Sequence, residues 1–159
     1  MEAIGIFRHA DSFFWALDRL HKAIPKEQAG KFAIPLTVLS CFASELFLKC
    51  LSYMETGEVT RTHLLSDLFD ELSSETQKIL EKHWDALITQ RKKILDRLDK
   101  TSGRKWPRDL RSNLKEGSDG FRLLRYVYEG GADFSFNLSD LPIALRNTIT
   151  EIKPEWNKP

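Results

Sequence analysis

Residues 43–49 read Ala43-Ser-Glu-Leu-Phe-Leu-Lys49 and place a carboxylate and an ammonium inside an otherwise apolar run from Phe32 to Met54. Core helices normally keep charge off such a stretch, because burying an unpaired charge costs several kcal/mol. Glu45 and Lys49 are four residues apart with the acid first, which is the better orientation for an ion pair on one helix face. The stretch therefore predicts a buried, central helix whose charged side chains find partners.

Apolar residues recur at intervals of three and four along most of the chain, which is the spacing of amphipathic helices. The pattern predicts four long helices, over about residues 6–24, 32–55, 74–100 and 139–153. Pro35 is expected in the first turn of the second of these helices, where proline is tolerated. Ser74 with Gln77 is expected to form a capping box at the start of the third.

Shorter elements complete the pattern. Thr62 is expected to cap a short helix, and a further helix should run from Phe121 to the Gly130-Gly131 pair. The glycine-containing segment 101–120 should hold a loop and at most a short helix. Since no strand alternation is visible, residues 1–159 are predicted to form one all-α domain. Its expected architecture is an up-and-down helical bundle of about five main helices with short extra helices.

Bulk properties suit a soluble domain, and charge is unevenly distributed. The net charge is only +1, but residues 91–125 contain twelve Lys or Arg against five Asp or Glu, whereas residues 66–85 contain two against six. Cys41 and Cys50 are expected to be reduced thiols of a cytoplasmic protein. The N-terminus lacks the pattern of a signal peptide, and Pro35, Glu45 and Lys49 make the apolar run a poor membrane span. No membrane association, cofactor or metal is expected.

Three segments together resemble the HEPN superfamily. They are Glu45-Leu-Phe-Leu-Lys49 on the second helix, Thr62-His63-Leu64 at the start of a short helix, and Arg125-Tyr126-Val-Tyr128-Glu129 late in the chain. The resemblance implies a helical bundle that is commonly dimeric. Many such proteins are metal-independent endoribonucleases of toxin–antitoxin or antiphage systems, or lie beside nucleotidyltransferase partners.

The chain departs from the catalytic pattern of that superfamily, in which an Arg precedes a His by roughly five to seven positions. None of the four histidines has Arg at the required distance, and the nearest match is Lys78 before His83. Lysine cannot provide the bidentate phosphate contact of arginine. Either the chain belongs to a non-catalytic branch or its chemistry uses other residues.

His63 is the best acid–base candidate, because a histidine in the first turn of a helix is kept neutral by the helix dipole. Arg61 would then be the phosphate-binding partner, and a plain packing role for His63 is the alternative. His21 is expected to be a core or interface histidine.

Two groups of side chains are candidates for ligand binding. Glu45 and Lys49 are expected to pair with Arg122 or Arg125 in a buried network that either specifies helix register or binds a ligand. Arg125, Tyr126 and Glu129 either line a cleft for a nucleotide or form an ordinary helical ion pair.

The second group lies in the basic stretch around Trp106, where cations alternate with an exposed aromatic ring. Its members are Arg104, Lys105, Trp106 and Arg108. Such interleaving suits single-stranded nucleic acid, although a solvated helix face followed by a loop explains the same residues.

The leading functional prediction is a non-catalytic or degenerate HEPN-like module that binds RNA, a nucleotide or a protein partner, in a bacterial stress, defence or toxin–antitoxin setting. Expected partners are a second copy of the chain and a protein such as an antitoxin or a nucleotidyltransferase. One alternative is a metal-independent endoribonuclease with His63 as base and Arg61 or Arg125 at the phosphate. The other alternative is a purely structural dimeric adapter.

Overall fold

The computed structural model describes residues 2–118, 124 and 138–157, and in these residues the protein is all-α with no strand. Six α-helices are present in this part: α1 (Ala3–Ala23), α2 (Ala29–Thr56), α3 (Leu65–Asp70), α4 (Ser74–Ser102), α5 (Leu110–Glu116) and α7 (Leu141–Ile152). Two short 3₁₀ turns, Lys26–Gln28 and Pro154–Asn157, precede α2 and follow α7. The predicted all-α class and the four long helices are confirmed.

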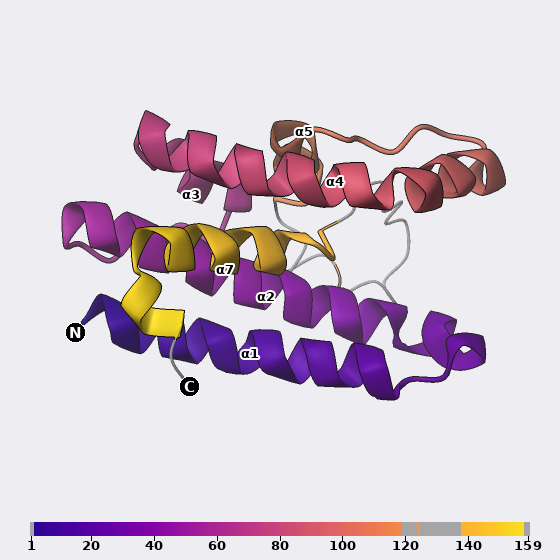
Figure 1. The fold of residues 1–159 in the computed structure, drawn as a ribbon, viewed down its shortest axis with the longest axis horizontal. Helices are drawn as coiled ribbons and strands as arrows, with labels where there is room; N and C mark the ends of the chain where they lie inside the picture. The colour runs from indigo at the N-terminus through magenta and orange to yellow at the C-terminus, as the bar shows by residue number, and fades with distance from the viewer. Residues whose placement is uncertain (1, 119–123, 125–137, 158–159) are drawn as a thin grey trace.

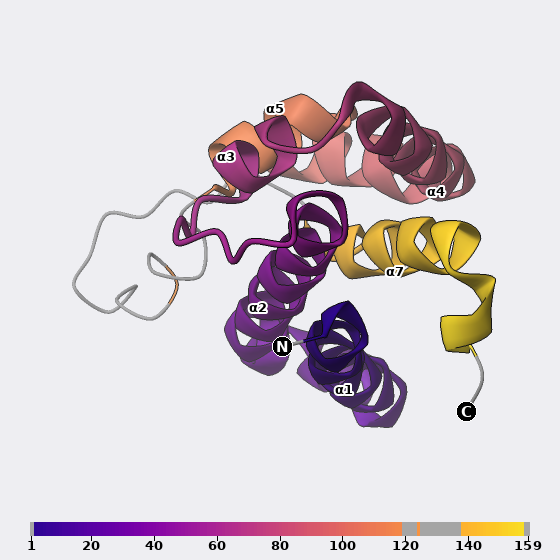
Figure 2. The same cartoon turned by 90° about the vertical axis from the view of Figure 1, so that its left-hand side faces the viewer.

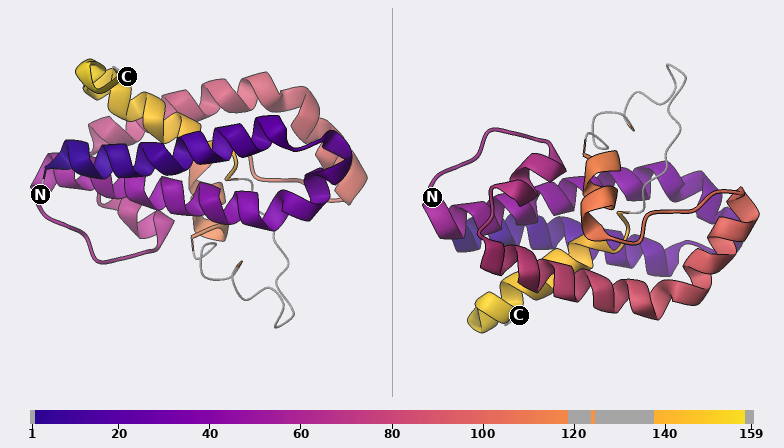
Figure 3. Two further views of the ribbon diagram at one scale, coloured as in Figure 1. Left: turned by 90° about the horizontal axis from the view of Figure 1, so that it is seen from below. Right: turned by 90° about the horizontal axis from the view of Figure 1, so that it is seen from above.

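Helix α2 lies at the centre of the molecule. It packs against α1 on one side, α7 on another and α3 on a third, and α7 in turn packs against α4 (Figures 1 and 2). The chain after α4 runs back to α5, which lies across the bundle beside α3 (Figure 3). The predicted central position of the helix that contains Glu45 is therefore confirmed.

The core is formed where these helices meet. Its largest fully buried side chains include Phe47, Leu48 and Leu51 of α2, Phe69 of α3, Trp84 of α4 and Leu145 of α7. Trp84 donates its indole N–H to the carbonyl of Arg108 at 2.7 Å, because a buried indole N–H needs an acceptor. This bond attaches the segment before α5 to the middle of α4.

Helix boundaries differ from the predictions at three places. Pro35 lies inside α2 and not in its first turn, because the helix already begins at Ala29. Thr62 is not a helix cap: its hydroxyl accepts from the amide of Leu64, and α3 begins only at Leu65. The cap of α4 is Ser73 and not Ser74, since the Ser73 hydroxyl accepts from the amide of Thr76 at 3.3 Å.

Two long helices end at glycine. Gly57 after α2 and Gly103 after α4 have φ values of 72° and 70°, the left-handed conformation that glycine adopts without steric cost. Gly103 reverses the chain so that residues 104–108 return along α4. The short helix expected within residues 101–120 is confirmed as α5.

Helix α2 is also long and apolar enough, by length and composition, to cross a membrane. Half of its most apolar stretch is buried inside the bundle, and the core helix of a soluble protein passes the same test. The finding is therefore weak evidence for a membrane span.

Candidate functional site

A polar cluster lies where α2 meets the extended segment that precedes α3. One carboxylate oxygen of Glu45, Oε1, is 3.0 Å from the Lys49 ammonium and 2.8 Å from Nδ1 of His63. Glu45 is almost fully buried, with only 5% of its side chain exposed, and Lys49 is 15% exposed. The predicted pairing of Glu45 with Lys49 on one helix face is confirmed, and His63 joins it from eighteen residues away.

His63 does not lie in the first turn of a helix, as expected, but in the extended segment before α3. Its ring is 76% exposed although Nδ1 contacts a buried carboxylate. Lys49 can only donate, so Oε1 acts as an acceptor and Nδ1 of His63 is the donor. A carboxylate that binds one ring nitrogen fixes the tautomer and orientation of an imidazole. Nε2 is then the nitrogen available to a ligand.

The negative charge of Glu45 also acts on a neighbouring thiol. Burial, and secondly the Glu45 carboxylate one helical turn away, raise the pKa of Cys41 to about 12. Burial likewise raises the pKa of Cys50 to about 12. Thiols with such pKa values are protonated at neutral pH and are poor nucleophiles. Both cysteines are therefore inert core residues.

A pocket of about 340 Å³ opens beside Lys49, between α1, α2 and the extended segment. It is lined by Gly5, Ile6, His9, Leu46, Lys49 and Val59. Its walls are mostly apolar, and Lys49 and His9 provide the polar groups. The sequence offered no sign that His9 and Lys49 share a pocket, because α1 and α2 meet only in the folded protein.

The C-terminal half of α4 carries a second concentration of candidate residues. Four exposed cations of this half, and one just after the helix, have no hydrogen bond or ion pair with the described residues: Lys92, Lys93, Arg97 and Lys100, and then Lys105. Lys93, Arg97 and Lys100 are spaced i, i+4 and i+7, so they share one face of the helix. The basic stretch of the sequence therefore forms a basic surface at the end of α4.

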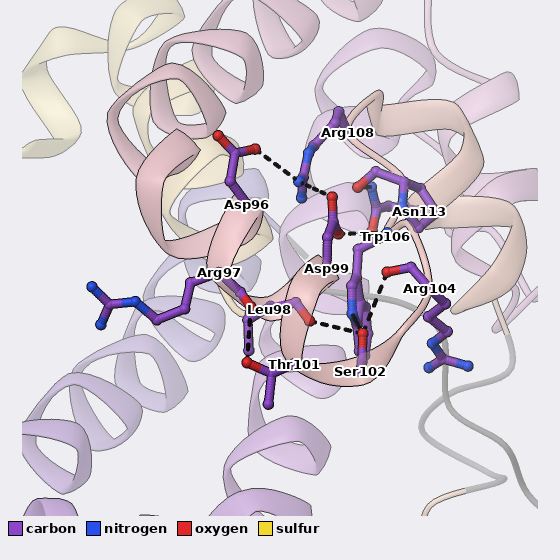
Figure 4. Close-up of polar contacts among 11 residues, drawn as sticks. Asp96, Arg97, Leu98, Asp99, Thr101, Ser102, Arg104, Trp106, Arg108 and Asn113 are labelled. Carbon is purple, nitrogen blue, oxygen red and sulfur yellow. Dashed lines mark hydrogen bonds and ion pairs between the residues drawn. The ribbon is translucent and has the colours of Figure 1, made fainter.

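Acidic residues of the same helix are already occupied. Arg108 binds Asp99 at 2.7 Å and Asp96 at 3.4 Å through Nη2, and the amide of Trp106 donates to Asp99 (Figure 4). Arg108 thus offsets one of these two negative charges, and its guanidinium already has two carboxylate partners. Figure 4 shows the Arg97 side chain extending away from this cluster.

Trp106 is half-buried and not fully exposed, because the chain folds back onto α4. Its indole N–H donates to the hydroxyl of Ser102 at 3.1 Å, and the guanidinium of Arg104 lies 4.6 Å from the ring centroid. This stacking is a cation–π contact. Arg104 and Trp106 form one unit at the margin of the basic surface, next to the exposed Lys105.

Two other arginines of the basic stretch bind acids of neighbouring elements. Arg91 pairs with the buried Asp140 at the start of α7, at 3.0 Å, and Arg111 pairs with Glu81 of α4 at the same distance. Burial raises the pKa of Asp140, and the charge of Arg91 opposes that rise only in part. These arginines join elements of the bundle.

Of the remaining predicted site residues, those that the structure describes do not join either cluster. Arg61 is exposed and forms no ion pair with the part of the chain that the structure describes. Arg122, Arg125, Tyr126 and Glu129 lie outside the described residues, and so does the helix expected over 121–131, apart from Leu124. His21, expected in the core or an interface, is exposed on α1.

One polar site that the sequence did not reveal joins α2 to α4. Glu55 accepts hydrogen bonds from the Ser73 amide, the Ser73 hydroxyl and the Thr76 hydroxyl, at 2.8, 2.7 and 2.6 Å. Burial acts to raise the pKa of Glu55, but these hydrogen bonds together outweigh it and lower the pKa. The site is structural, because every donor belongs to the start of α4.

Within residues 2–118, 124 and 138–157, no group of three or more His, Cys, Asp or Glu side chains is placed to hold a metal ion. Comparison of the chain with protein-family models, curated proteins and solved structures finds no match.

Proposed function

We propose that the chain is an HEPN-like up-and-down bundle that acts as a binding module for single-stranded RNA. The HEPN relationship is supported by the meeting of Glu45, Lys49 and His63 at one carboxylate oxygen. These residues belong to two of the three segments on which the resemblance rests, and the third lies outside the described residues. If the chain has the HEPN fold, these separate segments are expected to meet in space.

RNA binding is supported chiefly by the five cations at and just after the end of α4 that have no ion pair with the described residues. Arg108 offsets one of the two charges of Asp96 and Asp99, so this pair leaves one negative charge against the five cations of the surface. A row of cations bordered by a stacked Arg–Trp unit matches the single-strand binding surfaces in which phosphates contact Lys and Arg and bases stack on aromatic rings. Binding is expected to weaken as salt rises, because each neutralised phosphate releases counterions.

The test is fluorescence anisotropy with a labelled single-stranded RNA over a series of salt concentrations. The variant Lys93→Gln/Arg97→Gln removes two cations from the surface. Its affinity should fall at low salt, and the slope of log K against log salt should become shallower by about 1.4, at about 0.7 for each lost phosphate contact.

The matched control is Arg19→Gln/Lys78→Gln, which also removes one arginine and one lysine from exposed helical positions without an ion pair among the described residues. It should retain wild-type affinity and slope. Equal losses in the two variants would mean that only net charge matters, and salt-independent or absent binding by the wild type would refute the proposal.

A second candidate function is metal-independent endoribonuclease activity with His63 as general base. The observation in its favour is the 2.8 Å contact that holds Nδ1 of an exposed imidazole on a buried carboxylate. In this scheme Nε2 accepts the 2′-hydroxyl proton, and Arg61 contacts the phosphate. The pocket beside Lys49 would receive a base of the RNA.

This candidate is tested by incubating labelled RNA with the protein in the presence of a chelator. His63→Ala should abolish cleavage. His83→Ala is the control, since His83 also contacts a carboxylate at 2.8 Å, that of Glu151. Absence of cleavage by the wild type would leave RNA binding as the function.

The biological setting completes the proposal. We place the protein in the cytoplasm of a bacterium, as a homodimer in a stress, defence or toxin–antitoxin system. A protein partner would be an antitoxin or a nucleotidyltransferase. The adapter alternative corresponds to the homodimer alone, with neither RNA binding nor cleavage.

A further inference from the structure

The first eleven residues of α2 are apolar but unburied. The stretch Ala29-Gly-Lys-Phe-Ala-Ile-Pro-Leu-Thr-Val-Leu39 contains no buried residue, and its first seven residues are exposed. Phe32 and Ile34 are 37% and 42% exposed. By contrast, the second half of α2 supplies much of the core. The two halves of this helix therefore have different surroundings.

The end of α1 presents a similar surface. Trp15 and Leu20 are both exposed, and together with Phe32 and Ile34 they make up half of the large exposed apolar residues of the described chain. Helices α1 and α2 form an antiparallel hairpin whose connection lies at the end of the molecule opposite the N-terminus (Figures 1 and 3). We call this part, residues 15–34, the hairpin tip.

Cations accompany these apolar side chains. Arg19 and Lys31 are exposed and have no ion pair with the described residues, whereas Lys22 binds Asp18 at 2.7 Å. A shallow concavity of about 640 Å³ on α1 is lined by Trp15, Asp18, Arg19, Lys22 and Ala23. Aromatic and aliphatic residues next to Lys and Arg are the composition of helices that lie in a membrane interface.

We propose that the hairpin tip docks on an anionic phospholipid surface. Phe32 and Ile34, near the start of α2, enter the boundary between headgroups and acyl chains, and Arg19 and Lys31 contact lipid phosphates. This is peripheral contact with the cytoplasmic leaflet and not a membrane span. It goes beyond the RNA-binding function, because it uses α1 and α2 in place of α4.

The charge and shape of the hairpin tip favour a lipid surface over two other binding partners, a second copy of the chain and a helix of another protein. A symmetric contact between two tips would gather Arg19 and Lys31 of both copies in one apolar interface, and the repulsion of these like charges would oppose it. Amphipathic helices of partner proteins dock in grooves. The hairpin tip instead lies at one end of the molecule, where α4 also ends (Figure 1), and an end of this kind suits a soft and planar partner.

The experiment is co-sedimentation of the full chain with vesicles of phosphatidylcholine alone, or of phosphatidylcholine mixed with phosphatidylglycerol. The wild type should sediment with the anionic vesicles and not with the neutral ones. Phe32→Gln/Ile34→Gln should lower the partition coefficient at least about tenfold, from the loss of buried apolar area. Arg19→Gln/Lys31→Gln should lower it about fivefold per cation.

Two variants serve as matched controls. Val59→Gln/Leu64→Gln removes two exposed apolar side chains outside the hairpin tip, and Lys93→Gln/Arg97→Gln removes two cations from α4. Both should sediment like the wild type. Because the α4 variant is also the RNA-binding variant, failure of one proposal is distinguishable from failure of the other.

Three results would overturn the proposal. The first is a wild type that stays in the supernatant with anionic vesicles. The second is equal loss in the tip variants and in their controls. The third is concentration-dependent dimerisation that Phe32→Gln/Ile34→Gln abolishes in the absence of vesicle binding, since the tip would then be an interface between copies.

Discussion

Glu45 is the residue on which the polar cluster depends. It is almost fully buried, yet one of its oxygens accepts from both Lys49 and His63. Desolvating a carboxylate costs energy that its partners must offset. Removal of its charged and largely buried partner, Lys49, should therefore be more harmful than removal of the whole Glu45–Lys49 ion pair.

A double-mutant cycle tests this at Glu45 and Lys49. Lys49→Met leaves the Glu45 charge poorly compensated and should cost about 3 kcal/mol of unfolding free energy. Glu45→Leu/Lys49→Met should cost less than Lys49→Met alone, because no uncompensated charge remains. The measurement is the urea midpoint at unchanged m value.

His63 provides the control for that cycle. Since its ring is 76% exposed, His63→Ala should shift the urea midpoint little. If Glu45→Leu/Lys49→Met proves less stable than Lys49→Met alone, Glu45 is not a buried charge that depends on its ion pair.

The pH dependence of the free energy of unfolding should reveal the contribution of the ionised Glu55 side chain. Its pKa is lowered in the folded protein by hydrogen bonds from Ser73 and Thr76, after burial is overcome. The stabilisation from the Glu55 carboxylate is fully present at pH values above 4.5, the pKa of this group in the unfolded chain. It is lost as the pH falls through the lower pKa of the folded protein. The stability difference between wild type and Glu55→Gln should therefore shrink as pH falls from neutral into this range.

Glu58→Gln is the matched control for acid titration. The Glu58 side chain has no hydrogen bond or ion pair with the described residues. The free energies of unfolding of Glu58→Gln and of the wild type should differ little at every pH. A constant difference for Glu55→Gln would show that the contact to α4 does not depend on the Glu55 charge.

At the level of elements, the start of α4 shows how a helix boundary can be misplaced by one residue. Ser73 and Ser74 are chemically identical, and Ser74 with Gln77 matches the capping-box spacing. The structure uses Ser73, because Glu55 of α2 binds both its amide and its hydroxyl. Gln77 turns instead to the carbonyls of Phe69 and Leu72.

Alanine substitution should distinguish the two serines. Ser73→Ala should cost about 1 kcal/mol, as loss of a helix cap does, and Ser74→Ala should cost nearly nothing. Thermal or urea unfolding measures both. Equal costs, or a larger cost at Ser74, would contradict the cap assignment.

At the level of the whole molecule, charge is separated along α4 and its neighbours. The end of α4 is basic, whereas residues 66–85, which include α3 and the start of α4, contain six acids against two cations. Ile94 and Leu98 are exposed on α4, four residues apart. Antiparallel contact between two α4 helices at this point would bury both residues.

The expected homodimer can be tested on these residues. Sedimentation velocity over a range of concentrations should show a dimer that Ile94→Gln/Leu98→Gln weakens, because the contact loses apolar area. Val59→Gln/Leu64→Gln is the control. A wild type that remains monomeric at all concentrations would refute both the homodimer and the adapter function.

Local patterns in the sequence were sufficient for the helices and for the Glu45–Lys49 pair. A helix repeats every 3.6 residues, so neighbours on its face follow from spacing alone. The contact of His63 with Glu45, the pairing of Arg108 with Asp96 and Asp99, and the unburied start of α2 could not be inferred in this way. Each depends on how separate elements pack, and burial and pairing across the bundle are set by that packing and not by distance along the chain.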